Sequence, residues 1–78
     1  MTITVTTKSG SNILFIQKDN GEVFFQKGML SGKVVRISPI AIGKEINMDF
    51  HKDRLYGGIE EDTMLYRSTP VTNIIVTL

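Results

Sequence analysis

Short runs of β-branched and aromatic residues alternate with turn-forming residues along the whole chain, and this alternation constrains the fold most strongly. The runs span about four to eight residues and are separated by Ser-Gly-Ser-Asn, Asp-Asn-Gly, Ser-Gly-Lys, Ser-Pro and Gly-Gly. Glycine, asparagine and proline in such combinations favour reversals of the chain. No stretch of helical length shows the 3.6-residue period of an amphipathic helix. The sequence therefore predicts an all-β protein, a small antiparallel barrel or sandwich of about six to seven short strands.

The alternation of side chains also places the individual strands. We expect strands at residues 2–7, 12–18, 22–26, 33–38, 45–50, 63–68 and 71–78. In the fourth of these, Val35 and Ile37 should share one face of the sheet. In the fifth, Ile46, Met48 and Phe50 should face the core, opposite a polar face. Pairing of the last strand with the first would hold both ends of the chain.

Turns and loops should connect these strands. Asn20-Gly21 tolerates positive φ at both positions, so it predicts a type I′ hairpin between the second and third strands. Residues 27–32 should form a loop. Residues 51–62 form the longest stretch without a strand pattern, with one helical turn expected over 53–56 that ends at Gly57. Because long loops in small domains are often functional, this stretch is a candidate location for a site.

The chain has 78 residues and no cysteine, which predicts a single domain over residues 1–78 without a disulfide. A domain of this size buries only about 60% of its unfolded surface, so additional stability would come from close packing or from a homo-oligomer. The net charge of +1 argues against a protein that coats nucleic acid. Residues 2–7 lack the features of a secretory signal, and no run is long enough to span a membrane. We therefore expect a cytoplasmic protein with no membrane partner.

Phe24 and Phe25 are neighbours in the third predicted strand, so their side chains should point to opposite faces of the sheet. One of them should fill the core, and the other needs a cover. That cover would be either a second sheet layer of the same chain or the surface of a second subunit, and the sequence leaves both open. Phe24 and Phe25 are therefore the candidate interface residues of a homo-oligomer.

Residues suited to catalysis or metal binding are few. A serine nucleophile would need His51 as its base with Asp53 or Asp62 behind it, and we interpret His51 instead as a loop residue at the end of a strand. Glu60-Glu61-Asp62 lacks the spacing of a calcium loop and is interpreted as a solvated acidic turn. Gly57-Gly58 lacks the lysine and following helix of a phosphate-binding loop. We therefore expect no enzyme activity, no catalytic or metal-binding residues and no cofactor.

Basic, aromatic and hydroxyl side chains, most of them in the second half of the chain, form the main candidate binding set. Guanidinium groups bind phosphate through paired hydrogen bonds, aromatic rings stack on bases, and hydroxyls complete the shell around an anion. The candidate ligand-binding residues are Arg36, Lys52, Arg54, Tyr56, Tyr66, Arg67, Ser68 and Thr69. If they converge, they suit a small anionic nucleotide. If they do not, they are solvated charges and partly buried tyrosines.

The segment Leu65-Tyr66-Arg67-Ser68-Thr69-Pro70-Val71 resembles a region near the C-terminus of many very small bacteriophage accessory proteins, in which Tyr-Arg-Thr-Ser-x-Val leads into a final β-strand. Here the order is Ser68-Thr69 instead of Thr-Ser. The segment is a small part of the 78 residues. The resemblance implies a protein of the host cytoplasm that acts against a host or defence factor. Such proteins usually act by stoichiometric binding, without catalysis.

These observations together predict a non-enzymatic binding protein, a phage-encoded inhibitor that binds a host or defence protein or sequesters an anionic nucleotide. One alternative is a small β-barrel that binds nucleic acid, because such barrels present aromatic and basic residues on one sheet face. Another is a structural subunit of a virion or other assembly. That subunit would have large apolar interfaces and no soluble ligand.

Overall fold

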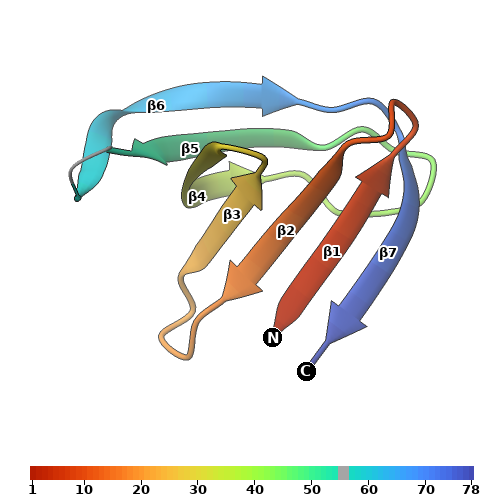
Figure 1. The fold of residues 1–78 in the computed structure, drawn as a ribbon, viewed down its shortest axis with the longest axis horizontal. Helices are drawn as coiled ribbons and strands as arrows, with labels where there is room; N and C mark the ends of the chain where they lie inside the picture. Colours follow the sequence, from red (N-terminus) through yellow and green to blue (C-terminus); the bar gives the residue numbers. More distant parts are fainter. Residues whose placement is uncertain (55–56) are drawn as a thin grey trace.

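The computed structural model describes residues 1–54 and 57–78, and these residues form seven strands and no helix. The strands are β1 (Thr2–Thr7), β2 (Asn12–Gln17), β3 (Val23–Lys27), β4 (Leu30–Ile37), β5 (Asn47–Asp53), β6 (Ile59–Arg67) and β7 (Val71–Thr77). All pairings between them are antiparallel (Figure 1). The prediction of an all-β antiparallel protein is therefore confirmed. The described ranges hold no helix of the length and hydrophobicity that crossing a bilayer requires.

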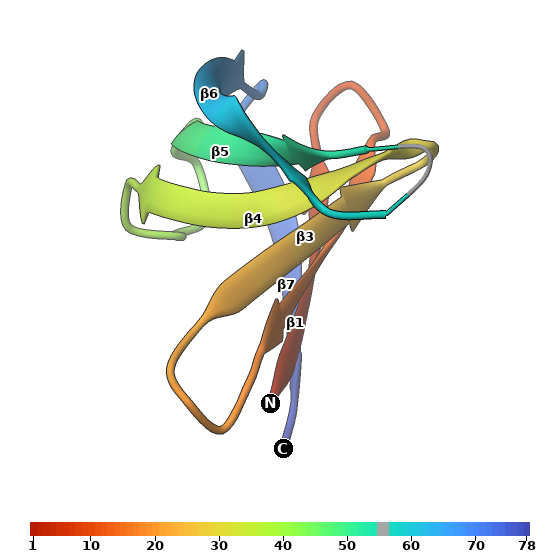
Figure 2. The ribbon, with the colours of Figure 1, turned by 90° about the vertical axis from the view of Figure 1, so that its left-hand side faces the viewer.

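All strands belong to one sheet in the order β6-β5-β4-β3-β2-β1-β7. The first six strands follow one another as neighbours, and β7 returns to pair with the free side of β1, which confirms the predicted pairing of the first and last strands. The sheet bends strongly, so that β4, β5 and β6 lie across β1, β2, β3 and β7 (Figures 1 and 2). The two halves enclose the core as in a sandwich. The sheet is not closed into a barrel, because β6 and β7 remain its two edges.

The core lies between the two halves of the bent sheet. Its buried apolar side chains are Val5, Ile13, Phe15, Phe25, Ile46, Met48, Phe50 and Val71. The burial of Ile46, Met48 and Phe50 confirms the inward face predicted for this segment. The rings of Phe25 and Phe50 meet edge to face, with centroids 4.7 Å apart, an arrangement that aromatic pairs favour.

Phe24 and Phe25 occupy different environments, as their adjacency in a strand predicts. Phe25 is buried in the core, whereas Phe24 is half-buried on the outer face of β3. The ammonium group of Lys18 lies 4.2 Å from the centroid of the Phe24 ring. This cation–π contact covers part of the ring from within the same chain.

The turn between β2 and β3 is a hairpin, as predicted, but the predicted type I′ geometry is wrong. The Gly21 N–H donates to the Lys18 carbonyl at 2.9 Å, and the Lys18 N–H donates to the Glu22 carbonyl at 2.8 Å. Gly21 has a φ of 89°, and no non-glycine residue in the described ranges has a positive φ. Asn20 therefore keeps a negative φ. Since Asp19 also belongs to the turn, the loop has one residue more than type I′ allows and becomes a type I turn with a glycine bulge.

Two segments predicted as loops contain strand residues. β4 begins at Leu30, inside the predicted loop 27–32, and β5 extends to Asp53 while β6 begins at Ile59. The long loop predicted over 51–62 is therefore wrong for most of the described residues, and so is the acidic turn at Glu60-Glu61-Asp62. These charged residues lie on an edge strand that is largely exposed on both faces. Such a strand needs no apolar alternation, so its sequence carries no strand signal.

A β-bulge in β4 changes which side chains face outward. The register against β5 shifts between Val34 and Arg36, so Val34 and Ile37 pack against the core while Val35 is exposed. The prediction that Val35 and Ile37 share a face is wrong, because the inserted residue reverses the alternation after Val34. The same bulge places Arg36 on the outer face of the sheet.

An exposed ion pair links the β2–β3 turn to β4. Lys33 Nζ lies 2.6 Å from Glu22 Oε2. The hydrogen bond from Lys33, followed by one from Asn20, lowers the pKa of Glu22 below its ordinary value of 4.5. The ionised form of Glu22 is therefore favoured in the folded protein.

We expect the Lys33→Met variant to have a slightly lower free energy of unfolding than the wild type. The size of this difference should depend on pH. A carboxyl group whose pKa is lowered on folding stabilises the protein above its unfolded pKa, and this contribution is lost as the pH falls through the folded pKa. Urea titrations of wild type and variant should differ at about pH 7 and converge in acid, below the folded pKa of Glu22. A Lys44→Met variant controls for the loss of a surface charge. A difference that is constant with pH would contradict the assignment.

Candidate functional site

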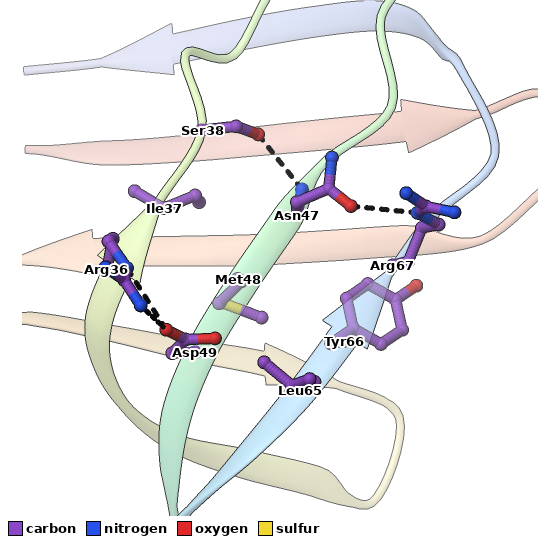
Figure 3. A pocket seen from close by; sticks show the side chains of 9 residues that line it. All are labelled: Arg36, Ile37, Ser38, Asn47, Met48, Asp49, Leu65, Tyr66 and Arg67. Atoms are coloured by element: carbon purple, nitrogen blue, oxygen red, sulfur yellow. Dashed lines mark hydrogen bonds and ion pairs between the residues drawn. The ribbon is translucent and has the colours of Figure 1, made fainter.

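Three of the candidate ligand-binding residues converge on one surface depression. Arg36 lies near the end of β4, and Tyr66 and Arg67 end β6, with β5 between them (Figure 3). The other described candidates lie elsewhere. They are Lys52 towards the other end of β5, Arg54 in the β5–β6 turn, and Ser68 and Thr69 between β6 and β7. Tyr56 lies outside the described residues.

The depression has a volume of about 490 Å³ and lies over the outer face of β4, β5 and β6. Its lining residues are Arg36, Ile37, Ser38, Asn47, Met48, Asp49, Leu65, Tyr66 and Arg67. Strand register explains the arrangement, because Asp49 pairs with Arg36 on one side and with Leu65 on the other. Residues paired directly across antiparallel strands lie side by side on one face. Leu65, Asp49 and Arg36 therefore form a row across three strands.

The charges of the depression are balanced within the chain. Arg36 donates from Nε to Asp49 Oδ2 at 3.1 Å and also bonds this oxygen through Nη2. Arg67 Nε donates to Asn47 Oδ1 at 2.9 Å and lies 3.3 Å from Glu45 Oε2. Both guanidinium groups are mostly exposed. Exposed ion pairs contribute about 0–1 kcal/mol, and the Arg67–Glu45 pair is of this kind, whereas the carboxylate of Asp49 is mostly covered.

Tyr66 does not present its ring to the outer face in the way that stacking on a base would need. It pairs with Met48 across β5 and β6 and packs against the core while remaining partly exposed. The ammonium group of Lys27, from β3, lies 5.5 Å from the centroid of its ring. The outward neighbours of Tyr66 along β6 are Leu65 and Arg67, which carry the chemistry of the outer face.

Ser68 and Thr69 use their hydroxyl groups to hold the fold. Ser68 is buried, and its Oγ accepts a hydrogen bond from the Ile46 N–H at 2.9 Å and donates to the Thr69 carbonyl at 2.7 Å. Thr69 Oγ1 accepts from the Ser9 N–H at 3.1 Å and donates to Ser9 Oγ at 3.2 Å. These bonds join the β6–β7 connection to the β1–β2 turn and to the segment before β5. Neither hydroxyl is directed to the depression.

His51 and the acidic residues do not form a reactive cluster. His51 lies within β5, so the interpretation as a loop residue is wrong, and its Nδ1 lies 3.2 Å from the Asp62 carbonyl oxygen. Among residues 1–54 and 57–78, no group of three or more His, Cys, Asp or Glu side chains is placed to hold a metal ion. The surface depression is therefore the strongest candidate site.

Sequence reasoning missed the residue at one end of this row. Leu65 is 82% exposed and lies beside its paired residue Asp49, two residues before Arg67 on the same outer face of β6 (Figure 3). Alternation around Tyr66 could have indicated it, because the neighbours of an inward residue in a strand face outward. Asn47 and Asp49 belong to the polar face predicted for β5, but their meeting with Arg36 and Arg67 depends on strand pairing.

The fold thus defines a small all-β protein built on one bent, open sheet. Comparison of the chain with protein-family models, curated proteins and solved structures found no match. Because function resides in sites and not in folds, it must be argued from the surface of this chain.

Proposed function

We propose that this chain is a non-enzymatic binding protein that recognises a protein partner through the outer face of β4, β5 and β6. The observation that carries the proposal is Leu65, a large apolar side chain that is 82% exposed within a polar surface. A single exposed apolar side chain is common on protein surfaces, so what distinguishes Leu65 is its position in a depression lined by arginine, carboxylate and amide groups. Arg67 follows it on the same face of β6 and Arg36 lies beyond Asp49 in the same row, and arginine is enriched at protein interfaces.

The charge and shape of the depression favour a protein over a nucleotide. A phosphate group approaching Arg36 or Arg67 would also meet the carboxylates of Asp49 and Glu45. Sites for small molecules usually bury about 70–90% of the ligand surface, whereas this depression lies open over a sheet face. A protein partner can cover an open face and bury the exposed side chain of Leu65. An inhibitor of a host or defence factor, as the resemblance to phage accessory proteins implies, would bind in this way.

We expect the Leu65→Ser variant to weaken partner binding by about fivefold or more, because truncation of an anchor residue at an interface costs more than about 1 kcal/mol. The matched control is Met29→Ser, since Met29 is fully exposed at the β3–β4 turn, outside the depression. Wild type and both variants would be purified from cell lysate without denaturation and analysed by native mass spectrometry. The partner mass should persist with Met29→Ser and fall with Leu65→Ser.

Two outcomes of this experiment would contradict the proposal. One is a partner retained equally by the Leu65→Ser variant, which would place the interface on another surface. The other is a retained mass of nucleotide size that disappears on denaturation, which would favour sequestration of a nucleotide. Circular dichroism of each variant separates loss of binding from loss of fold.

A further inference from the structure

The two edge strands of the sheet differ sharply in charge. β6 carries Glu60, Glu61, Asp62 and Arg67, whereas β7 has the sequence Val-Thr-Asn-Ile-Ile-Val-Thr and no charged residue. Charged side chains on an edge strand prevent its pairing with another strand, and an uncharged apolar edge permits such pairing. The acidic first half of β6 is therefore protected against strand pairing, whereas β7 has no such charge anywhere along its length.

The apolar side chains of β7 extend along both of its faces. Ile75 is 55% exposed and Val76 is 54% exposed. Ile75 pairs with Thr4 and lies on the outer face of the sheet, whereas Val76 pairs with Ile3 on the face towards the core. A strand added beside β7 would cover part of both side chains at once.

The outer edge of β7 also offers backbone hydrogen-bonding groups. Met1 O accepts from the Gln17 N–H and the Thr7 N–H donates to Ser11 O, so the odd-numbered residues of β1 bond towards β2. Because bonding alternates along an antiparallel strand, Thr2, Thr4 and Thr6 bond towards β7. Their partners on β7 are Thr77, Ile75 and Asn73. The backbone groups of Ile74 and Val76 consequently point away from the sheet.

Within the described ranges, only the start of β7 has a neighbour on its outer side. The Gly43 N–H donates to Val71 O at 2.7 Å, and the Val71 N–H donates to Lys44 O at 2.8 Å. Figure 1 shows the loop between β4 and β5 passing beside this end of β7, while the rest of the strand runs clear of it towards the C-terminus. The free edge therefore covers residues 72–77.

We propose that two copies of this chain pair antiparallel through β7, about a twofold axis at Ile75. In this register, hydrogen-bonded pairs of Ile74 with the second copy's Val76 flank a non-hydrogen-bonded pair of the two Ile75 side chains. In this register, apolar side chains of the two copies lie opposite each other on both faces of the sheet, and Asn73 lies opposite the second copy's Thr77. A twofold interface sets each patch against itself, which an uncharged strand tolerates because no like charges are opposed. The result is one continuous sheet with seven strands from each copy.

The Ile75→Cys variant tests the register directly. The chain has no cysteine, so the variant carries a single thiol. Non-hydrogen-bonded antiparallel pairs hold their Cα atoms about 4.5 Å apart, within the range of about 4.4–6.8 Å that a disulfide needs. We expect a disulfide-linked dimer under mild oxidation. The control is Leu65→Cys, on the opposite edge of the sheet, which should form the disulfide-linked dimer at least about tenfold more slowly. Equal rates of cross-linking for the two variants would overturn the proposed register.

The Ile75→Lys variant tests the interface by a second route. It would place two ammonium groups opposite each other at the axis, and like charges directly opposite each other in a sheet are destabilising. At about 50 µM, a concentration suited to micromolar affinity, native mass spectra should show dimers for wild type and for Met29→Lys, a charge added at an exposed turn residue outside both proposed interfaces, and monomers for Ile75→Lys. A monomeric wild type, or a dimer that survives Ile75→Lys, would overturn the proposal. So would a different protein bound in an Ile75-dependent way, because it would identify a foreign strand as the occupant of β7.

Discussion

Truncation of Phe50 to alanine is expected to lower the free energy of unfolding by about 3–5 kcal/mol. The side chain is 1% exposed and its ring meets that of Phe25 edge to face, so truncation removes both apolar burial and an aromatic contact. A chain of 78 residues has a total stability of about 4–12 kcal/mol, at about 0.05–0.15 kcal/mol per residue. The variant should therefore lose a large part of the stability of the protein.

Urea denaturation followed by circular dichroism measures this effect, and two further variants set its scale. Phe50→Leu keeps most of the apolar volume and should cost about 1–2 kcal/mol. Leu65→Ala truncates an exposed residue on the neighbouring strand and should stay within about 0.5 kcal/mol of wild type. A Phe50→Ala variant within about 1 kcal/mol of wild type would show that the core is not organised around this ring.

Local sequence patterns were sufficient for the parts of the fold in which one strand face is buried. Residues 45–50 alternate between apolar and polar types, and the structure buries Ile46, Met48 and Phe50. β6 could not be predicted over its full length, because an edge strand exposed on both faces has no need of alternation. The bulge after Val34 also leaves no local signal, since it depends on how β4 and β5 are aligned.

The candidate site shows the same limit in a different form. Arg36 and Arg67 are basic residues that the sequence singled out, and both line the depression. Their meeting depends on the register of β4, β5 and β6, a non-local property that no single segment encodes. Ser68 was selected for the chemistry of its hydroxyl, but that hydroxyl is used by the buried bond from the Ile46 N–H. The residue type therefore predicted which interactions a side chain can make. Strand pairing decided whether that side chain is available to a ligand or is already bonded within the fold.

The proposed partner surface and the proposed dimer contact use different parts of the sheet. The depression lies over β4, β5 and β6, whereas the pairing uses β7 at the other edge. A twofold dimer would thus carry two depressions. A partner with two equivalent sites could occupy both, and it would then bind more tightly than through a single site. Since Leu65 and Ile75 belong to separate edges, the failure of one proposal leaves the other intact.

The second large effect is expected at Gly32, where substitution by alanine should cost about 1–3 kcal/mol or more. Each of the other six glycines has a positive φ, but Gly32 does not, so its backbone conformation suits any residue. The requirement is steric. A Cβ at this position would overlap the carbonyl oxygen of His51 and lie 3.2 Å from the Cα of Lys52. Both obstacles are backbone atoms of β5, so relief requires the β4–β5 pairing itself to move.

Gly32 also pairs with Phe25 on β3, and the substitution would therefore disturb the bend at which the two halves of the sheet meet. The matched control is Ser31→Ala on the adjacent residue, which removes only the hydrogen bond from Ser31 Oγ to Asp53 Oδ2 at 2.8 Å and should cost about 1 kcal/mol. Thermal and urea denaturation of both variants would measure the difference. If Gly32→Ala were no more destabilising than Ser31→Ala, β4 and β5 could move apart at this point without lowering the free energy of unfolding. The close approach of the two strands would then not be what selects glycine at position 32.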